Sequence, residues 1–209
     1  MKRRPRPKGI SLKAVFGLGN PGLIYALTRH NVGFEVIDLY RKVHHLRKKG
    51  RIEGSALVYQ HKNLFLVKPM AFMNESGRAV RAVLSQHSVG PSDALIVYDD
   101  LDLPLGRIRI LARGGAGTHK GMRSILDALD TEEIPRLRVG IDVAERSQSG
   151  HDFVLDRFTP REWETLVPAM KRAVDAISLF RCTDIGAVMT QFNRRGNAVV
   201  DETTRRILY

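Results

Sequence analysis

The sequence predicts an α/β protein, a single domain in which a mixed, mostly parallel twisted sheet is flanked by helices. Two observations support this prediction. Short apolar runs typical of buried strands alternate along the chain with segments of helical periodicity. The 209 residues are also 43% hydrophobic and 27% charged, which supplies enough apolar side chains for one packed core.

The first half of the chain contains three predicted strands and two predicted helices. The strands are apolar runs bounded by turn residues, the last two joined as a hairpin, and they lie at 14–18, 56–60 and 64–68. The helices repeat apolar residues along one face, and they lie at 32–43 and after Ser76. His30 falls at the start of the first helix.

The second half begins with the nearly all-apolar run 94–98, which is typical of a central strand covered on both faces and ends in Asp99, Asp100 and Asp102. Further strands are predicted at 107–111 and 137–143, and further helices after the glycine-rich segment to about 129, and at 184–192. Thr159-Pro160-Arg161-Glu162 has the spacing of a capping box, which predicts that a long helix begins there and runs to about 180.

The composition indicates a polyanionic partner and a reducing compartment. The formal charge is +12, with a pI of about 10.3, although a solvated basic surface with basic ends would give the same count. A single cysteine, Cys182, excludes an internal disulfide. Since no apolar stretch has the length of a signal peptide or a membrane span, we expect a cytoplasmic protein that does not enter a membrane.

Gly17, Gly19 and Gly22 match the G-x-G-x-x-G fingerprint of a dinucleotide site directly after a strand. The fingerprint also requires an acidic residue that closes a second strand about 20 residues on, whereas residues 38–51 are predicted to be helical and then basic. A tight turn that needs glycine is the favoured interpretation.

His30 and Asp99 are the candidate catalytic pair. A single histidine is more often structural, but both residues follow predicted central strands, whose carboxyl ends converge on one crevice. A carboxylate that binds one imidazole nitrogen fixes the tautomer and leaves the other nitrogen to accept a proton from water. Asn20 and Asn74 could steady the oxyanion if they face the same crevice, although asparagine beside glycine is also common in turns.

The glycine-rich segment 114–121 could present backbone amides to an anion, and the flanking Arg107, Arg109, Arg113 and Lys120 suit phosphate contacts. A flexible loop is the alternative interpretation of this segment.

The sequence contains no G-x-S-x-G nucleophile elbow, so water is the favoured nucleophile. His44 and His45 have no companion at ligand spacing, and we expect neither a metal nor a cofactor.

Several separate blocks of the sequence resemble the bacterial-type peptidyl-tRNA hydrolase family. They occur in the family's order and comprise Gly-Leu-Gly-Asn-Pro-Gly at 17–22, Tyr25, Thr-Arg-His-Asn at 28–31, Lys-Pro at 68–69, Phe-Met-Asn-Glu-Ser-Gly at 72–77, Asp-Asp-Leu-Asp-Leu-Pro at 99–104, 114–121, 136–141 and 153–155. The likeness covers 12–195, which we take as the domain. The basic ends 1–11 and 197–209 lie outside it and are expected to be flexible.

The resemblance implies a phosphorylase/hydrolase-like fold and a cofactor-free, monomeric esterase that frees tRNA from peptidyl-tRNA. By position, His30 matches the catalytic base, Asp99 the carboxylate that stabilises it, and Asn20 the asparagine that selects peptidyl over aminoacyl ends. Met73 matches a residue packed over the histidine. The other expected substrate- or tRNA-binding residues are Tyr25, Phe72, Asn74, His119, Lys120 and Arg138.

One position departs from the family. Lys120 stands where the family usually has asparagine, which keeps hydrogen-bond donors and adds a charge but loses an acceptor. We expect Lys120 still to contact the substrate, at a phosphate group. A non-catalytic RNA-binding module built on the same fold is the alternative function, and the residues that the chemistry requires favour the enzyme.

Overall fold

The computed structural model describes residues 11–143 and 150–194. Of the two predicted basic ends, only Ser11 lies within these ranges. No helix of the described residues has both the length and the apolar character needed to cross a bilayer.

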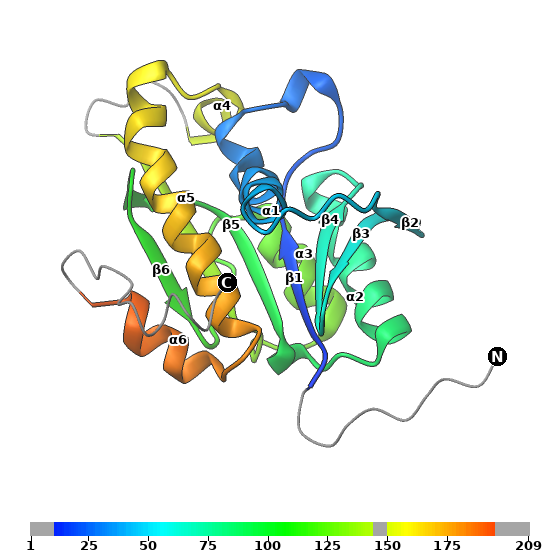
Figure 1. Ribbon diagram of the computed structural model, residues 1–209. Helices are drawn as coiled ribbons and strands as arrows, with labels where there is room; N and C mark the ends of the chain where they lie inside the picture. Colours follow the sequence, from blue (N-terminus) through cyan, green and yellow to red (C-terminus); the bar gives the residue numbers. More distant parts are fainter. Residues whose placement is uncertain (1–10, 144–149, 195–209) are drawn as a thin grey trace.

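A seven-stranded sheet runs through the molecule in the order β2-β3-β4-β1-β5-β7-β6 (Figure 1). The strands are β1 (Lys13–Gly17), β2 (Arg51–Glu53), β3 (Ala56–His61), β4 (Leu64–Pro69), β5 (Ala94–Pro104), β6 (Ile108–Leu111) and β7 (Arg136–Asp142). The four central strands β4, β1, β5 and β7 are parallel, and the outer strands pair antiparallel at both edges. The predicted mixed sheet with a parallel core is confirmed.

Helices cover both faces of the sheet (Figure 1). One face carries α1 (Val32–Val43), α4 (Gly150–Leu155), α5 (Pro160–Phe180) and α6 (Ile185–Phe192). The other carries α2 (Ser76–His87) and α3 (Lys120–Leu129). In β1, Val15 packs into the first apolar layer, whereas Ala14 and Phe16 pack into the second. A strand that is buried on both faces reads as an unbroken apolar run, as the sequence does here.

Short 3₁₀ turns connect these elements near the carboxyl ends of the parallel strands. They are η1 (Leu23–Tyr25), η2 (Arg29–Asn31) and η3 (Met73–Glu75). A fourth turn, η4 (Pro91–Asp93), lies at the amino end of β5 and leads into it. His30 lies in η2, directly before α1 rather than within it. The predicted capping box is confirmed, because the Thr159 side chain accepts from the Glu162 N–H while the Glu162 carboxylate accepts from the Thr159 N–H.

The structure differs from the predicted pattern at β5. The acidic cluster does not follow the strand, since β5 continues to Pro104 and buries Asp99 and Asp100. His119 stabilises the carboxylate of Asp99, and Arg138 stabilises that of Asp100. These partners lie far away in the sequence, so the local pattern of charges does not reveal that the carboxylates are buried. Strand β2 and helix α4 were not predicted, because three and six residues respectively are too few to give a clear periodicity.

The glycines of the G-x-G-x-x-G pattern serve packing and turning. A Cβ atom on Gly17 would lie 2.1 Å from the carbonyl oxygen of Gly33, so β1 and α1 cross with their backbones almost in contact. Gly22 has a φ of 109°, which only glycine adopts easily. A Cβ atom on Gly19 would lie 2.8 Å from Cγ of Phe34, so this position also has no room for a side chain. These three constraints account for the pattern and agree with the favoured interpretation as a turn.

Candidate active site

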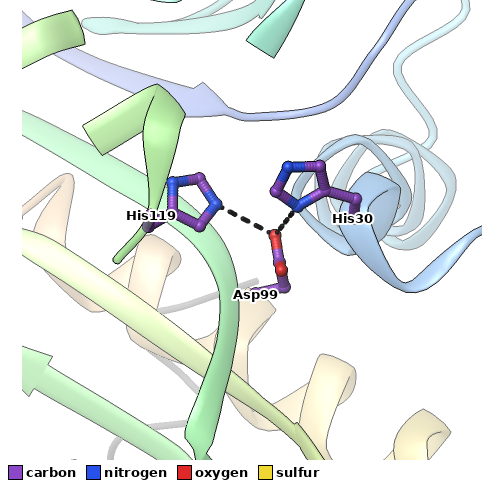
Figure 2. A group of neighbouring side chains, drawn as sticks. All are labelled: His30, Asp99 and His119. Atoms are coloured by element: carbon purple, nitrogen blue, oxygen red, sulfur yellow. Dashed lines mark hydrogen bonds and ion pairs between the residues drawn. The ribbon is translucent and has the colours of Figure 1, made fainter. Parts of the chain in front are cut away.

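His30 and Asp99 meet at the carboxyl edge of the central strands, as the sequence predicts. The Nδ1 atom of His30 lies 2.8 Å from Oδ1 of Asp99 (Figure 2). Asp99 is almost fully buried, whereas His30 exposes 12% of its side chain. No hydrogen bond joins Nε2 of His30 to another described residue. If Nδ1–H donates to Asp99, this second nitrogen carries a lone pair that is open to a reactant.

His119 binds the same carboxylate oxygen, with Nε2 of the imidazole 3.1 Å from Oδ1 of Asp99 (Figure 2). Its other nitrogen, Nδ1, accepts the backbone N–H of Met122 and so caps the first turn of α3. An accepting Nδ1 leaves the proton on Nε2, which then donates to Asp99. The helix cap therefore fixes the tautomer of His119 and makes it a second N–H donor to the carboxylate.

Interactions among His30, Asp99 and His119 shift the pKa values of Asp99 and His30. Burial alone would raise the pKa of Asp99, but electrostatic attraction to His30 and His119 and the hydrogen bonds that both imidazoles donate hold it well below its usual range. Burial would lower the pKa of His30, and the attraction and hydrogen bond of Asp99 overcome this, so that the pKa rises above its ordinary value. Asp99 therefore stays ionised and favours the proton-accepting role of His30.

The ligand-type atoms of His30, Asp99 and His119 lie within 4.8 Å of one another, so the group must be tested as a metal site. A neutral histidine that bound a metal through Nε2 would carry its proton on Nδ1. In His119 that proton would face the Met122 N–H, and the cap of α3 would be lost. The hydrogen bonds of His119 thus suit a carboxylate partner better than a metal ion.

A clamp of hydrogen bonds orients Asn20. Its backbone N–H donates to Oδ1 of Asn31 at 2.8 Å, and Nδ2 of Asn31 donates back to the Asn20 carbonyl oxygen at 3.0 Å. Oδ1 of Asn20 accepts the N–H of Met73 at 2.8 Å. The amide oxygen is therefore occupied, and the side-chain NH₂ is the group left to donate. Asn31 was not predicted as a site residue, although it adjoins His30 in the sequence.

A cavity of about 690 Å³ lies beside His30. His30, Asp99, His119, Lys120 and Arg138 line it together with the glycine-rich loop. Arg138 forms an ion pair with Asp100. Lys120 is exposed at the first position of α3, and its charge acts to lower the pKa of His30.

The glycine-rich loop is tied to the sheet. The buried guanidinium of Arg136 donates through Nη1 to the Gly115 carbonyl oxygen at 2.7 Å. Arg123 donates to the carbonyl oxygen of Gly117 at 3.0 Å, and Gly117 has a φ of 58°. These two hydrogen bonds hold the loop against the cavity that it lines.

Five predicted site residues do not line the cavity: Asn20, which was predicted as catalytic, and Tyr25, Phe72, Met73 and Asn74, which were predicted to bind the substrate. The Tyr25 and Phe72 rings meet edge to face, with centroids 6.4 Å apart. Asn74 is exposed and lies next to Met73 in η3. Met73 is buried, with its sulfur beside the position that a Cβ atom of Gly121 would occupy.

Arg29 anchors the turn that carries His30. Its Nη2 atom donates to both carboxylate oxygens of Glu162, at 2.9 and 3.0 Å. Its guanidinium also lies over the rings of Phe153 and Phe158, at 4.1 and 4.9 Å from their centroids. A bridge between Thr28 and Arg157 adds a backbone link. The turn η2 is thus fastened to α4 and the start of α5, which sequence reasoning did not foresee.

Comparisons with known proteins show similarity to one family. The profile of the family described as "Peptidyl-tRNA hydrolase" matches residues 14–200. Proteins named peptidyl-tRNA hydrolase are 40% identical in Chloroflexus aggregans, over 86% of this chain and 97% of that protein, and 44% identical in Carboxydothermus hydrogenoformans, over 87% and 98%. The crystal structure of peptidyl-tRNA hydrolase from Acinetobacter baumannii superimposes with a TM-score of 0.79 at 27% identity, covering 90% of this chain and 97% of that one.

Proposed function

Because the chain belongs to the peptidyl-tRNA hydrolase family, we propose that it hydrolyses the ester bond between a peptide and tRNA, with His30 as the general base. One observation carries the assignment of the base. His30 lines the cavity and is held through Nδ1 by a buried, ionised carboxylate, and its Nε2 atom makes no hydrogen bond to another described residue.

In the first step, Nε2 of His30 takes a proton from water while the water oxygen attacks the ester carbonyl carbon. The imidazole becomes positively charged, and the charge of Asp99 stabilises it at 2.8 Å. His119 keeps the second hydrogen bond to Asp99, so this carboxylate does not turn away. General-base catalysis of this kind contributes roughly 10²–10⁴-fold to the rate.

In the second step, the tetrahedral intermediate collapses. The bond between the carbonyl carbon and the ribose oxygen breaks, and the protonated His30 returns its proton to that oxygen. The products are a tRNA with a free terminal hydroxyl and a peptide with a free carboxyl group, which releases the second proton of the water to solvent and becomes a carboxylate. The side-chain NH₂ of Asn20 is the proposed donor to the oxyanion, since its own oxygen is occupied by the Met73 N–H.

The tRNA is proposed to lie over the cavity side of the site. The exposed Lys120 supplies a positive charge there that is not paired with another described residue, and the glycine-rich loop places backbone groups beside it, while Arg138 is held by Asp100. We place the catalytic domain at residues 12–195 and propose that it acts in the cytoplasm as a monomer. The alternative function, an RNA-binding module without catalysis, is not favoured, because both relatives named above are hydrolases.

The direct test is release of an N-acetylated amino acid from labelled tRNA by the purified protein and by the His30→Ala variant. We expect kcat to fall by about 10³-fold or more, because the proton acceptor is removed. Affinity for the tRNA should change little, since His30 has no phosphate-binding charge when neutral. Normal turnover by the variant would rule out the proposed mechanism.

A further inference from the structure

Exposed apolar side chains gather next to the site, in segments that do not line the cavity. Seven large hydrophobic residues are exposed in the described parts of the chain, and five of them lie in two short segments, 23–27 and 70–72. We call these five the apolar rim: Leu23, Ile24, Leu27, Met70 and Phe72. Leu23 and Ile24 are the most exposed, at 89% and 75%. Exposed apolar patches of this kind mark binding surfaces.

The two segments meet at the edge-to-face contact between Tyr25 and Phe72. Leu27 also has a φ of 64°, a conformation that costs a leucine free energy, and its exposed side chain gains no core packing in return. Backbone strain of this kind is common at functional sites. Folding therefore gives no reason for leucine at this position.

Both segments are fastened to the reacting groups. The carbonyl oxygen of Tyr25 accepts from the N–H and the hydroxyl of Thr28, at 3.2 and 2.8 Å, and η2 with His30 follows directly. On the other segment, Met73 follows Phe72 and donates its N–H to Asn20. The segment between β1 and α1 arcs over the carboxyl end of the sheet (Figure 1). The rim is thus continuous with the groups proposed to act on the ester.

The cavity and the apolar rim differ in chemistry. The cavity side has the exposed Lys120, which forms no ion pair with another described residue and suits a phosphate, and the backbone of the glycine-rich loop, while Arg138 there is already paired with Asp100. The rim offers apolar carbon. The proposed substrate is divided in the same way at the scissile ester, since one side is a polyanion and the other is a peptide. Charge complementarity assigns the polyanion to the cavity side and leaves the rim to the peptide.

We infer that the apolar rim binds the side chains of the peptide next to the ester and gives this enzyme a preference for apolar residues there. The inference rests on the proposed function and adds a specificity site to it. Leu23 and Ile24 are its principal contacts, because they are the most exposed members and no other described role requires them to be apolar.

The test compares one tRNA charged in turn with N-acetyl-leucine and N-acetyl-glycine. We expect kcat/KM of the unaltered protein to be about tenfold higher for the leucyl ester, the lower end of what an apolar contact contributes. The double variant Leu23→Ser, Ile24→Ser should bring this ratio close to one. Both side chains are exposed, so the substitutions remove no core packing.

The matched control is Ile52→Ser, which removes an equally apolar and 69% exposed side chain from β2. It should keep the leucyl preference. An unchanged ratio in the double variant would overturn the inference. An equal loss for both substrates would also overturn it, because the rim would then hold a part common to all substrates, such as the terminal base.

A binding measurement separates this inference from the proposed function. The same two tRNAs are prepared with an amide in place of the ester, and their equilibrium affinities are measured. Selective binding of the leucyl form without hydrolysis of the esters would contradict the proposed function and support the inference that the apolar rim binds apolar side chains. Hydrolysis of both esters without selectivity in rate or affinity would contradict the inference about the apolar rim and leave the proposed function standing.

Discussion

Two groups of histidines lie at opposite edges of the parallel strands. At the carboxyl edge, His30 and His119 share the carboxylate of Asp99. At the amino edge, where His61 pairs with the first residue of β4, His44 and His61 pack together with Tyr40. The ring centroids of Tyr40 and His44 are 4.2 Å apart, and those of His44 and His61 are 5.1 Å apart.

The pKa of His30 is shifted in the opposite direction to the pKa values of His44 and His61. Burial lowers the pKa of His44 to about 4, and the charges of His61 and Arg181 act in the same sense. At His30 burial also acts to lower the pKa, but Asp99 reverses the sign. Both histidines are partly buried, so the sign of the neighbouring charge decides whether an imidazole can accept a proton near neutral pH.

Among the substitutions that test the difference between the two histidine groups, Asp99→Asn is expected to have the largest effect. It removes the negative charge that distinguishes the group of His30 and His119. We expect kcat to fall by roughly 10³-fold, as a neutral partner cannot stabilise the protonated imidazole. Activity needs neutral His30 and therefore rises as pH increases through its pKa. Since the variant loses the interaction that raises this pKa, the acidic limb of the pH–rate profile should move to lower pH. A limb that stayed in place would contradict this account.

His119→Asn should have the next largest effect. The new side chain keeps an oxygen that can cap α3 but does not supply the N–H donor at the position of Nε2. We expect kcat to fall by about tenfold, the value of one hydrogen bond to a charged group. The thermal unfolding temperature should change little, which separates this effect from a loss of fold. Unaltered turnover would show that one histidine donor is enough for Asp99.

The lowered pKa of His44 in the second group leads to a prediction about the free energy of unfolding at acidic pH. The folded-state pKa of His44, about 4, lies below its ordinary value, so the neutral form is favoured by folding. Its contribution is therefore complete above about pH 6.5 and is lost as the pH falls towards 4. The loss should be on the order of 1 kcal/mol, allowing for solvent screening of this half-buried ring.

Urea unfolding at pH 7.5 and pH 4.5 measures this loss. In His44→Phe, which keeps a ring beside Tyr40 but cannot titrate, the free energy of unfolding should fall less between the two pH values. His45→Asn is the control, because His45 is exposed and asparagine tolerates its positive φ. An equal fall in the His44 variant and the unaltered protein would refute the prediction.

The smallest effect is expected from Lys120→Asn. A cation lowers the imidazole pKa in both groups, through Arg181 at His44 and Lys120 at His30. Removing Lys120 should move the acidic limb of the pH–rate profile upwards and should weaken tRNA binding a few-fold, since one phosphate contact is lost. Lys120→Arg, which keeps the charge, should do neither. If Lys120→Asn left binding and turnover untouched, Lys120 would have no contact with the substrate.

The sequence predicts the layered fold and the meeting of His30 with Asp99, because apolar runs and strand ends depend on local pattern. It does not predict the continuation of β5 through Asp99 and Asp100, since local sequence cannot show that charged residues have buried partners. His119 and Arg138 provide these partners from 20 and 38 positions further along the chain. The roles of the site residues remain predictions that the variants above test.

The carboxylate of Glu162 closes the first turn of α5 and also holds the guanidinium beside His30. All seven strands end by Asp142, so a chain cut before Thr159 would still contain the whole sheet and every residue assigned to the chemistry. It would nevertheless lack the counterion for Arg29, whose charge would be left buried between aromatic rings. The reacting groups therefore depend on a distant part of the chain, and no shorter working enzyme should be obtainable by trimming from the carboxyl end past this helix.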